Sequence, residues 1–342
     1  MGPVVLLSYG PGFVRARDNE NHQCRALCHK LRVEAQIVIK PILIALASFL
    51  IMTAHSVAED GPIHLVPLPN AHISFLEAKL RIDNDIVPQD VDAAHEVKKI
   101  AHIVRGMAGE GATSAQKLMA LKKYLYESGP WNDFRPYEYD QSDPLGRNLR
   151  NQLLSTYLTT RRGNCVTMPL LMLFAGQEIG LKMTLAEAPS HMLIKYTDDD
   201  GRTWNLEATS GGGFTRDVWY RQKLSMSDAA ITHGVYLRAL DHDEAVALIS
   251  STLLEYKMEQ KSYEEAIVIA DDLLQLNPKF VFALVMKGSA YAALLRRETT
   301  GRYTTVDQIA EPERIKFDTW YRLNQEAFAK AEALGWTAED GK

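Results

Sequence analysis

Three residues of this 342-residue chain have the types and the order needed for nucleophilic catalysis: Cys165, His191 and Glu207. A cysteine thiolate attacks a carbonyl carbon, an imidazole takes and returns the proton, and a carboxylate orients the imidazole. Together these groups form the cysteine version of a catalytic triad, which breaks an amide through a covalent acyl-enzyme. The sequence therefore predicts nucleophilic catalysis at a carbonyl carbon, on condition that folding brings the three side chains together.

Cys165 directly precedes an apolar segment that is predicted to be a helix, residues 166–179. At the beginning of a helix, the unpaired backbone N–H groups and the helix dipole favour the thiolate and lower the pKa of a cysteine. The same groups can hold an oxyanion, so the backbone N–H of Cys165 is expected to contribute to an oxyanion hole. The polar turn RRGN at residues 161–164 predicts that the thiol is exposed.

His191 and Glu207 belong to a predicted β-hairpin. Residues 191–197 alternate between polar and apolar (HMLIKYT), the run DDDG at 198–201 is typical of a turn, and residues 203–209 (TWNLEAT) form the return strand. In an antiparallel pair, the beginning of one strand lies beside the end of the next. We therefore expect His191 and Glu207 to be neighbours at one end of a small sheet.

The three motifs as a set resemble the core of the transglutaminase-like superfamily, which has a papain-like fold. They read RRGNCVTMPLLMLFAGQEIGL around the cysteine, APSHMLIKY around the histidine and WNLEATSGG around the glutamate. The resemblance implies a nucleophilic cysteine at a helix start, a histidine that opens a strand and an acidic residue that ends the partner strand. Cys165, His191 and Glu207 fall on those positions, with Glu207 in place of the usual aspartate.

The resemblance implies a cysteine enzyme without a cofactor and leaves two reactions open. An acyl-enzyme can be resolved by water, as in a peptidase or amidase, or by an amine, as in a transglutaminase. We expect hydrolysis, since it needs no site for a second substrate. The competing interpretation is an inert scaffold that binds proteins through the C-terminal helices. No histidine spacing in the sequence indicates a metal site.

The segments around these motifs predict an α+β fold, a helix bundle packed on a small antiparallel sheet, over residues 75–238. Apolar spacing indicates helices at residues 91–107, 115–126 and 149–158. Asp90 is the predicted N-cap of the first, and Thr113 or Ser114 that of the second. A further strand is expected at 183–188, and residues 131–148, rich in aromatic and turn residues, are expected to form a loop.

Residues 239–342 are predicted to be a helical tail. The tail is predicted to contain one helix at 260–278, a second at 280–295 and a further helix at 317–334. Helices paired in this way resemble tetratricopeptide repeats. Ala266, Gly288 and Tyr291 fall at the positions such repeats reserve for small and aromatic residues. A bacterial subgroup of the transglutaminase-like superfamily joins its core to repeats of this kind, which implies a protein partner for the tail.

The N-terminal residues are typical of an export signal. Basic residues precede the apolar run PILIALASFLIMT at 41–53, and small residues follow it up to Ala58. We expect an N-terminal extension and signal over residues 1–58 with cleavage after Ala58, a Pro-rich linker at 59–74, and a periplasmic or otherwise exported protein without a stable membrane span. An uncleaved membrane anchor is the alternative.

Composition excludes several classes of protein. Hydrophobic residues make up 46% and charged residues 24%, as in a globular protein, and the net charge of −5 favours no nucleic-acid partner. Three cysteines cannot form a disulfide framework, and only Cys165 remains after the predicted cleavage. The resemblance to the transglutaminase-like superfamily implies a protein or peptide substrate at the site.

Overall fold

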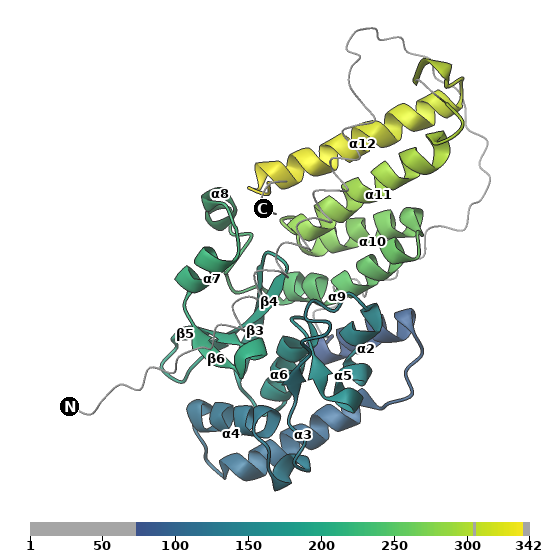
Figure 1. Ribbon diagram of the computed structural model, residues 1–342. Coiled ribbons are helices and arrows are strands. Elements are labelled where there is room, and N and C mark those ends of the chain that lie inside the picture. Colours follow the sequence, from purple (N-terminus) through teal and green to yellow (C-terminus); the bar gives the residue numbers. More distant parts are fainter. Residues whose placement is uncertain (1–72, 304–305, 338–342) are drawn as a thin grey trace.

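The computed structural model describes residues 73–303 and 306–337, which form an α+β core followed by a helical C-terminal region (Figure 1). Both parts of this fold class are as predicted. The expected signal at 1–58 and nearly all of the expected linker at 59–74 lie outside the described residues. Within the described ranges, no helix combines the length and apolar character needed to cross a membrane.

The first three helices of the core are α2 (Phe75–Ile86), α3 (Ala93–Ala108) and α4 (Ser114–Tyr126). Thr113 caps α4 in a capping box with Gln116, so this prediction is confirmed. The prediction that Asp90 is the N-cap of α3 is wrong. Asp92 caps that helix, because its side chain accepts a hydrogen bond from the backbone N–H of His95 at 3.0 Å.

The predicted helix at 149–158 is divided into a 3₁₀ turn (Leu149–Gln152) and α5 (Leu154–Thr160). At the break, Leu153 has an extended backbone, and the N–H of Leu154 donates to the Asp83 carboxylate of α2 at 2.8 Å. A contact between segments that are distant in sequence therefore starts a new helix. The helix that follows, α6 (Thr167–Glu178), is almost wholly buried at the centre of the core.

The main sheet is antiparallel with strands in the order β3-β4-β5-β6. Their bounds are Lys182–Ala188, His191–Thr197, Thr203–Glu207 and Gly213–Thr215. Helix α6 packs in one cluster with Leu185, Ile194 and Leu206, and α7 (Asp217–Lys223) packs with Ala186 and Leu193 in another. Because Ile194 and Leu193 are neighbours on one strand, the two clusters lie on opposite faces of the sheet.

A second, two-stranded sheet lies just before α6. Its strands, β1 (Glu138–Tyr139) and β2 (Arg162–Gly163), are parallel and pair Tyr139 with Gly163. This pairing, which the sequence pattern did not indicate, brings residues 131–148 alongside the turn that carries Cys165.

The tail stacks its helices in chain order away from the core, as Figure 1 shows. After the short α8 (Asp228–Thr232) come α9 (His242–Glu259), α10 (Tyr263–Leu276), α11 (Val281–Thr299) and α12 (Glu313–Ala333). Gly288 permits the close packing of α11 on α12, since a Cβ there would lie 2.8 Å from the Phe328 ring. The helix pairs predicted from the spacing of apolar residues are present.

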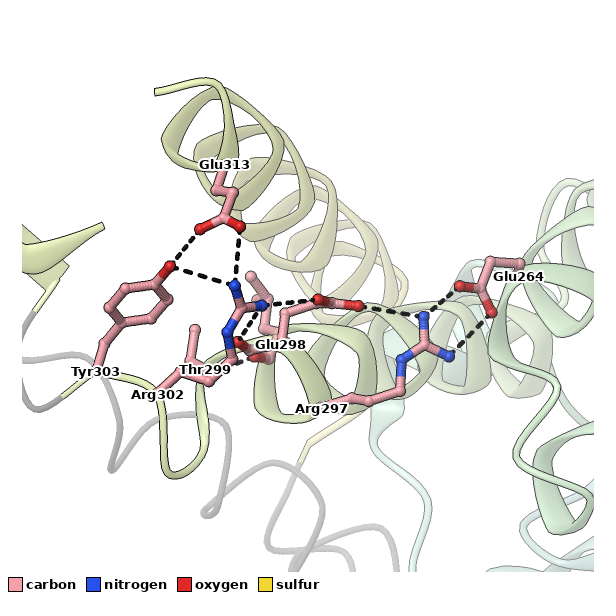
Figure 2. A network of polar contacts seen from close by, with 8 residues as sticks. Glu264, Arg297, Glu298, Thr299, Arg302, Tyr303 and Glu313 are labelled. Carbon is pink, nitrogen blue, oxygen red and sulfur yellow. Dashed lines mark hydrogen bonds and ion pairs between the residues drawn. The ribbon is translucent and has the colours of Figure 1, made fainter. Parts of the chain in front are cut away.

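Exposed charges connect the outer helices of the tail (Figure 2). Arg297 of α11 forms ion pairs with Glu264 of α10 and with Glu298, and Arg302 links Glu298 to Glu313 of α12. Solvent-exposed pairs of this kind contribute little each. The network therefore supplies only a small part of the stability of these helices.

A buried polar chain joins the tail to the core. The Gln152 side-chain amide donates to Glu255 of α9 at 2.8 Å and to the carbonyl of Gly146 at 3.0 Å. The backbone carbonyl of Gln152 accepts a hydrogen bond from the Lys79 ammonium at 2.9 Å, and Lys79 also forms an ion pair with Asp83 at 2.7 Å. These contacts fix α9 to α2 and to the loop before α6.

Candidate active site

Cys165 lies in the turn that leads into α6, two residues before the helix begins at Thr167, and the Asn164 side chain caps the first N–H groups of that turn and helix. The Asn164 side-chain oxygen accepts from the backbone N–H groups of Val166 at 3.0 Å and Thr167 at 3.1 Å. The Thr167 hydroxyl in turn accepts from the N–H of Asn164 at 3.2 Å. The asparagine three positions before a threonine is an N-cap signal that the sequence contains and that our prediction did not use.

The Cys165 sulfur lies against the hairpin turn that leads into β4. The thiol donates to the carbonyl oxygen of Ser190 at 3.8 Å, and Ser190 has a left-handed backbone (φ 56°) and directly precedes His191. Only 6% of Cys165 is exposed, so the prediction of an exposed thiol was wrong. The turn at Ser190 on one side and the loop at Pro144 on the other cover the residue.

His191 and Glu207 form a buried pair at the end of the sheet. The imidazole Nε2 of His191 and the Oε2 of Glu207 are 2.8 Å apart, and their side chains are 12% and 3% exposed. Since an ionised carboxylate only accepts hydrogen bonds, this contact places the proton of the neutral imidazole on Nε2. Nδ1 is then the ring nitrogen with a lone pair, able to accept a proton from a thiol.

Two further residues hold the Glu207 carboxylate in place. Its Oε2 also accepts from the Tyr220 hydroxyl of α7 at 2.9 Å, and its Oε1 accepts from the backbone N–H of Thr209 at 3.1 Å and from the Thr209 hydroxyl. These donors satisfy a carboxylate that is almost fully buried, and they fix its direction toward His191. Our sequence analysis missed Tyr220, because no local pattern connects α7 to the hairpin.

The backbone N–H of Cys165 is engaged in the structure. It donates to the carbonyl oxygen of Pro144 at 3.3 Å, and the Tyr139 hydroxyl donates to the same oxygen, also at 3.3 Å. The sequence predicted this N–H as an oxyanion donor. As the chain is folded here, an internal carbonyl occupies the position beside it.

The loop that carries Pro144 is fastened at several points. The Asp143 carboxylate accepts from the backbone N–H groups of Arg147 at 2.7 Å and Asn148 at 3.2 Å, and from the Asn151 amide at 2.7 Å. Gly146 has a φ of 65°, and a Cβ there would lie 2.6 Å from the Asn164 side-chain amide. Glycine is therefore required where this loop meets the residue that caps α6.

A carboxyl group near the site has a strongly raised pKa. Glu187 of β3 is 9% exposed, and it pairs across the strands with Met192, the residue after His191. Burial raises the pKa of Glu187 to about 8, although the charge of Arg238 acts in the opposite direction. Within the residues described, no group of three or more His, Cys, Asp or Glu side chains is arranged to hold a metal ion.

One family model matches the part of the chain that contains α6 and the hairpin. The sequence model of the transglutaminase-like superfamily matches residues 92–247. This segment is a transglutaminase-like domain. It contains Cys165, His191 and Glu207, and its match ends inside α9. No solved structure is significantly similar to the chain.

Three bacterial proteins are similar to a larger part of the chain than this domain. Protein SirB1 of Salmonella typhimurium is 24% identical over 202 residues, which cover 58% of this chain and 71% of SirB1. The UPF0162 protein YchA of Escherichia coli K12 is 24% identical over 240 residues, 69% of this chain and 83% of YchA. A UPF0162 protein of Buchnera aphidicola (subspecies Schizaphis graminum) is 24% identical over 258 residues, 73% of this chain and 81% of its own. The similarity therefore extends beyond the transglutaminase-like domain.

Proposed function

We propose that this protein is a cysteine hydrolase that acts on amide or peptide bonds, with Cys165 as nucleophile, His191 as base and Glu207 as the residue that orients the imidazole. The observation that carries the proposal is the buried contact between His191 and Glu207, at 2.8 Å, next to a turn whose carbonyl touches the Cys165 sulfur. His191 is held in one tautomer by Glu207 and directly follows Ser190, whose carbonyl contacts the Cys165 thiol, and these two features favour cysteine catalysis.

The reaction proceeds in two halves. Nδ1 of His191 takes the thiol proton, the Cys165 sulfur bonds to the carbonyl carbon, and the carbonyl π electrons move to oxygen. The tetrahedral species collapses as the imidazolium gives its proton to the leaving amine, so that a thioester remains. Water then loses a proton to His191 and adds to the thioester, and the acid leaves as the sulfur regains a proton. An amine in place of water would give transfer instead.

The decisive test is the reactivity of the Cys165 thiol with iodoacetamide as a function of pH. In the full chain with Cys24→Ser and Cys28→Ser, Cys165 is the single remaining thiol. We expect its apparent pKa to lie below the value of about 8.5 of a free cysteine, and we expect His191→Ala to bring it back toward that value. Glu207→Gln should act in the same direction, because the imidazolium loses its charged partner.

The matched control is His102→Ala, which removes an exposed histidine of α3 and should leave the profile unchanged. If the thiol titrates like free cysteine and its pKa does not change in His191→Ala, the proposal that the protein is an enzyme is contradicted. That outcome would favour the inert scaffold, with the tail as the part that binds proteins. Detection of acid or of amine-linked product from a peptide library then separates hydrolysis from transfer.

We also propose that the protein is exported, which rests on the basic and apolar pattern before Ala58. Sequencing the N-terminus of the protein isolated from its native cells tests this. A mature chain that begins at Glu59 in the periplasmic fraction is the expected result, and an intact N-terminus in the membrane fraction would favour an anchor.

A further inference from the structure

Two hydrogen-bond donors from different parts of the domain converge on one oxygen beside the candidate nucleophile. The backbone N–H of Cys165 and the hydroxyl of Tyr139 each lie 3.3 Å from the carbonyl oxygen of Pro144. An oxyanion hole consists of two such donors directed at one point next to the attacking atom. The backbone N–H of a nucleophilic residue is one donor by position, and Tyr139 supplies a second.

We propose that Tyr139 is a catalytic residue whose hydroxyl, with the N–H of Cys165, binds the oxyanion, and that the Pro144 carbonyl occupies this hole until a substrate carbonyl replaces it. The proposal rests on the proposed function, because an oxyanion forms only if Cys165 attacks a carbonyl. It also narrows the substrate: the group that fits the hole is a peptide-type carbonyl, which is the group found there now.

Local structure explains why Tyr139 can act from a fixed position. Tyr139 is in β1, which pairs residue for residue with β2, so its partner is Gly163, two positions before the nucleophile. The N–H of Asp140 donates to the Gly163 carbonyl at 2.7 Å, which extends this pairing past Tyr139. The two donors therefore belong to one rigid strand pair and helix start. An anionic oxygen would shorten both contacts, because hydrogen bonds to charged acceptors are shorter and stronger.

The Pro144 carbonyl must leave before substrate can enter. Its peptide lies in the loop that Asp143 and Gly146 fasten from either side, and the sulfur beneath is nearly inaccessible. The structure thus represents a closed state in which the chain's own carbonyl blocks the hole, and displacement of one loop opens it.

The test compares two reactions of the same thiol in the chain with Cys24→Ser and Cys28→Ser. Acylation by p-nitrophenyl acetate passes through an oxyanion, whereas alkylation by iodoacetamide displaces iodide at a saturated carbon and forms none. Tyr139→Phe removes only the hydroxyl. We expect the ratio of the acylation rate to the alkylation rate to fall about 100-fold, as for loss of one oxyanion donor, because any loosening of the loop at Pro144 exposes the thiol to both reagents alike. The control is Tyr157→Phe, which removes the hydroxyl of a buried tyrosine on α5 and should change neither rate.

An unchanged ratio of acylation to alkylation in Tyr139→Phe would overturn the assignment of Tyr139 alone. A wild-type thiol that is not acylated, and that titrates like free cysteine, would overturn the proposed function and this inference with it. If Tyr139→Phe fails to fold, 3-fluorotyrosine at position 139 decides the question. Its more acidic hydroxyl donates more strongly and should speed acylation without affecting alkylation, and an unchanged acylation rate would refute the role.

Discussion

Burial of the Glu187 carboxyl predicts how the free energy of unfolding changes with pH. Its pKa is about 8 in the folded chain, against an ordinary value of 4.5. Between these two values, the folded protein holds a proton that the unfolded chain has released. Raising the pH through this window therefore favours the unfolded state, by about 1.4 kcal/mol per pH unit for one proton. From pH 5 to pH 8 the loss amounts to about 4 kcal/mol, a large share of the stability of an ordinary domain.

Glu187→Gln removes this titration and keeps the shape of the side chain. We expect the free energy of unfolding of the wild type to fall with rising pH more steeply than that of the variant, by about 4 kcal/mol over the same range. Urea unfolding of the full chain at several pH values, followed by circular dichroism, measures both curves. Glu110→Gln, which alters an exposed carboxyl, should follow the wild type. Parallel curves for wild type and Glu187→Gln would refute the reasoning that this carboxyl is buried and neutral.

Two further predictions concern the surroundings of Cys165. Asn164→Ala removes the cap of α6 and should lower the free energy of unfolding by about 1–2 kcal/mol, measured by urea titration; a variant as stable as the wild type would show that the cap contributes nothing. Asp143→Ala removes the acceptor of three hydrogen bonds that fasten the loop at Pro144. Local opening should become easier and Cys165 should react with iodoacetamide about tenfold faster, and an unchanged rate would mean that other contacts keep the loop closed.

The elements that carry the candidate site could be predicted because their signals are local. The apolar run after Cys165, the alternation from His191 and the turn that follows each depend on neighbours in the sequence. The spacing of His191 and Glu207 around one hairpin turn was enough to predict that their side chains are neighbours, and they are in contact in the structure.

What could not be predicted depends on contacts between distant segments. Asp83 of α2 starts α5 by capping the N–H of Leu154, so the continuous helical pattern at 149–158 gave no sign of the break. Tyr139 reaches the site through a parallel pairing of two very short strands, and Tyr220 reaches it from α7. The same packing buried Cys165, although the residues before it are polar. Each of these features arises from tertiary packing that overrides the local signal.

The polar chain from Glu255 through Gln152 to Gly146 has a consequence for how the protein can be divided. Glu255 is contributed by the tail, whereas Gly146 adjoins the residue that caps α6. Cutting the chain before α9 would leave the Gln152 amide and the Lys79 ammonium without this acidic neighbour and would remove one of the contacts that fix the loop over the thiol. The core and the tail are thus mechanically coupled, so that binding of a protein to the outer helices would be transmitted to the loop beside Cys165.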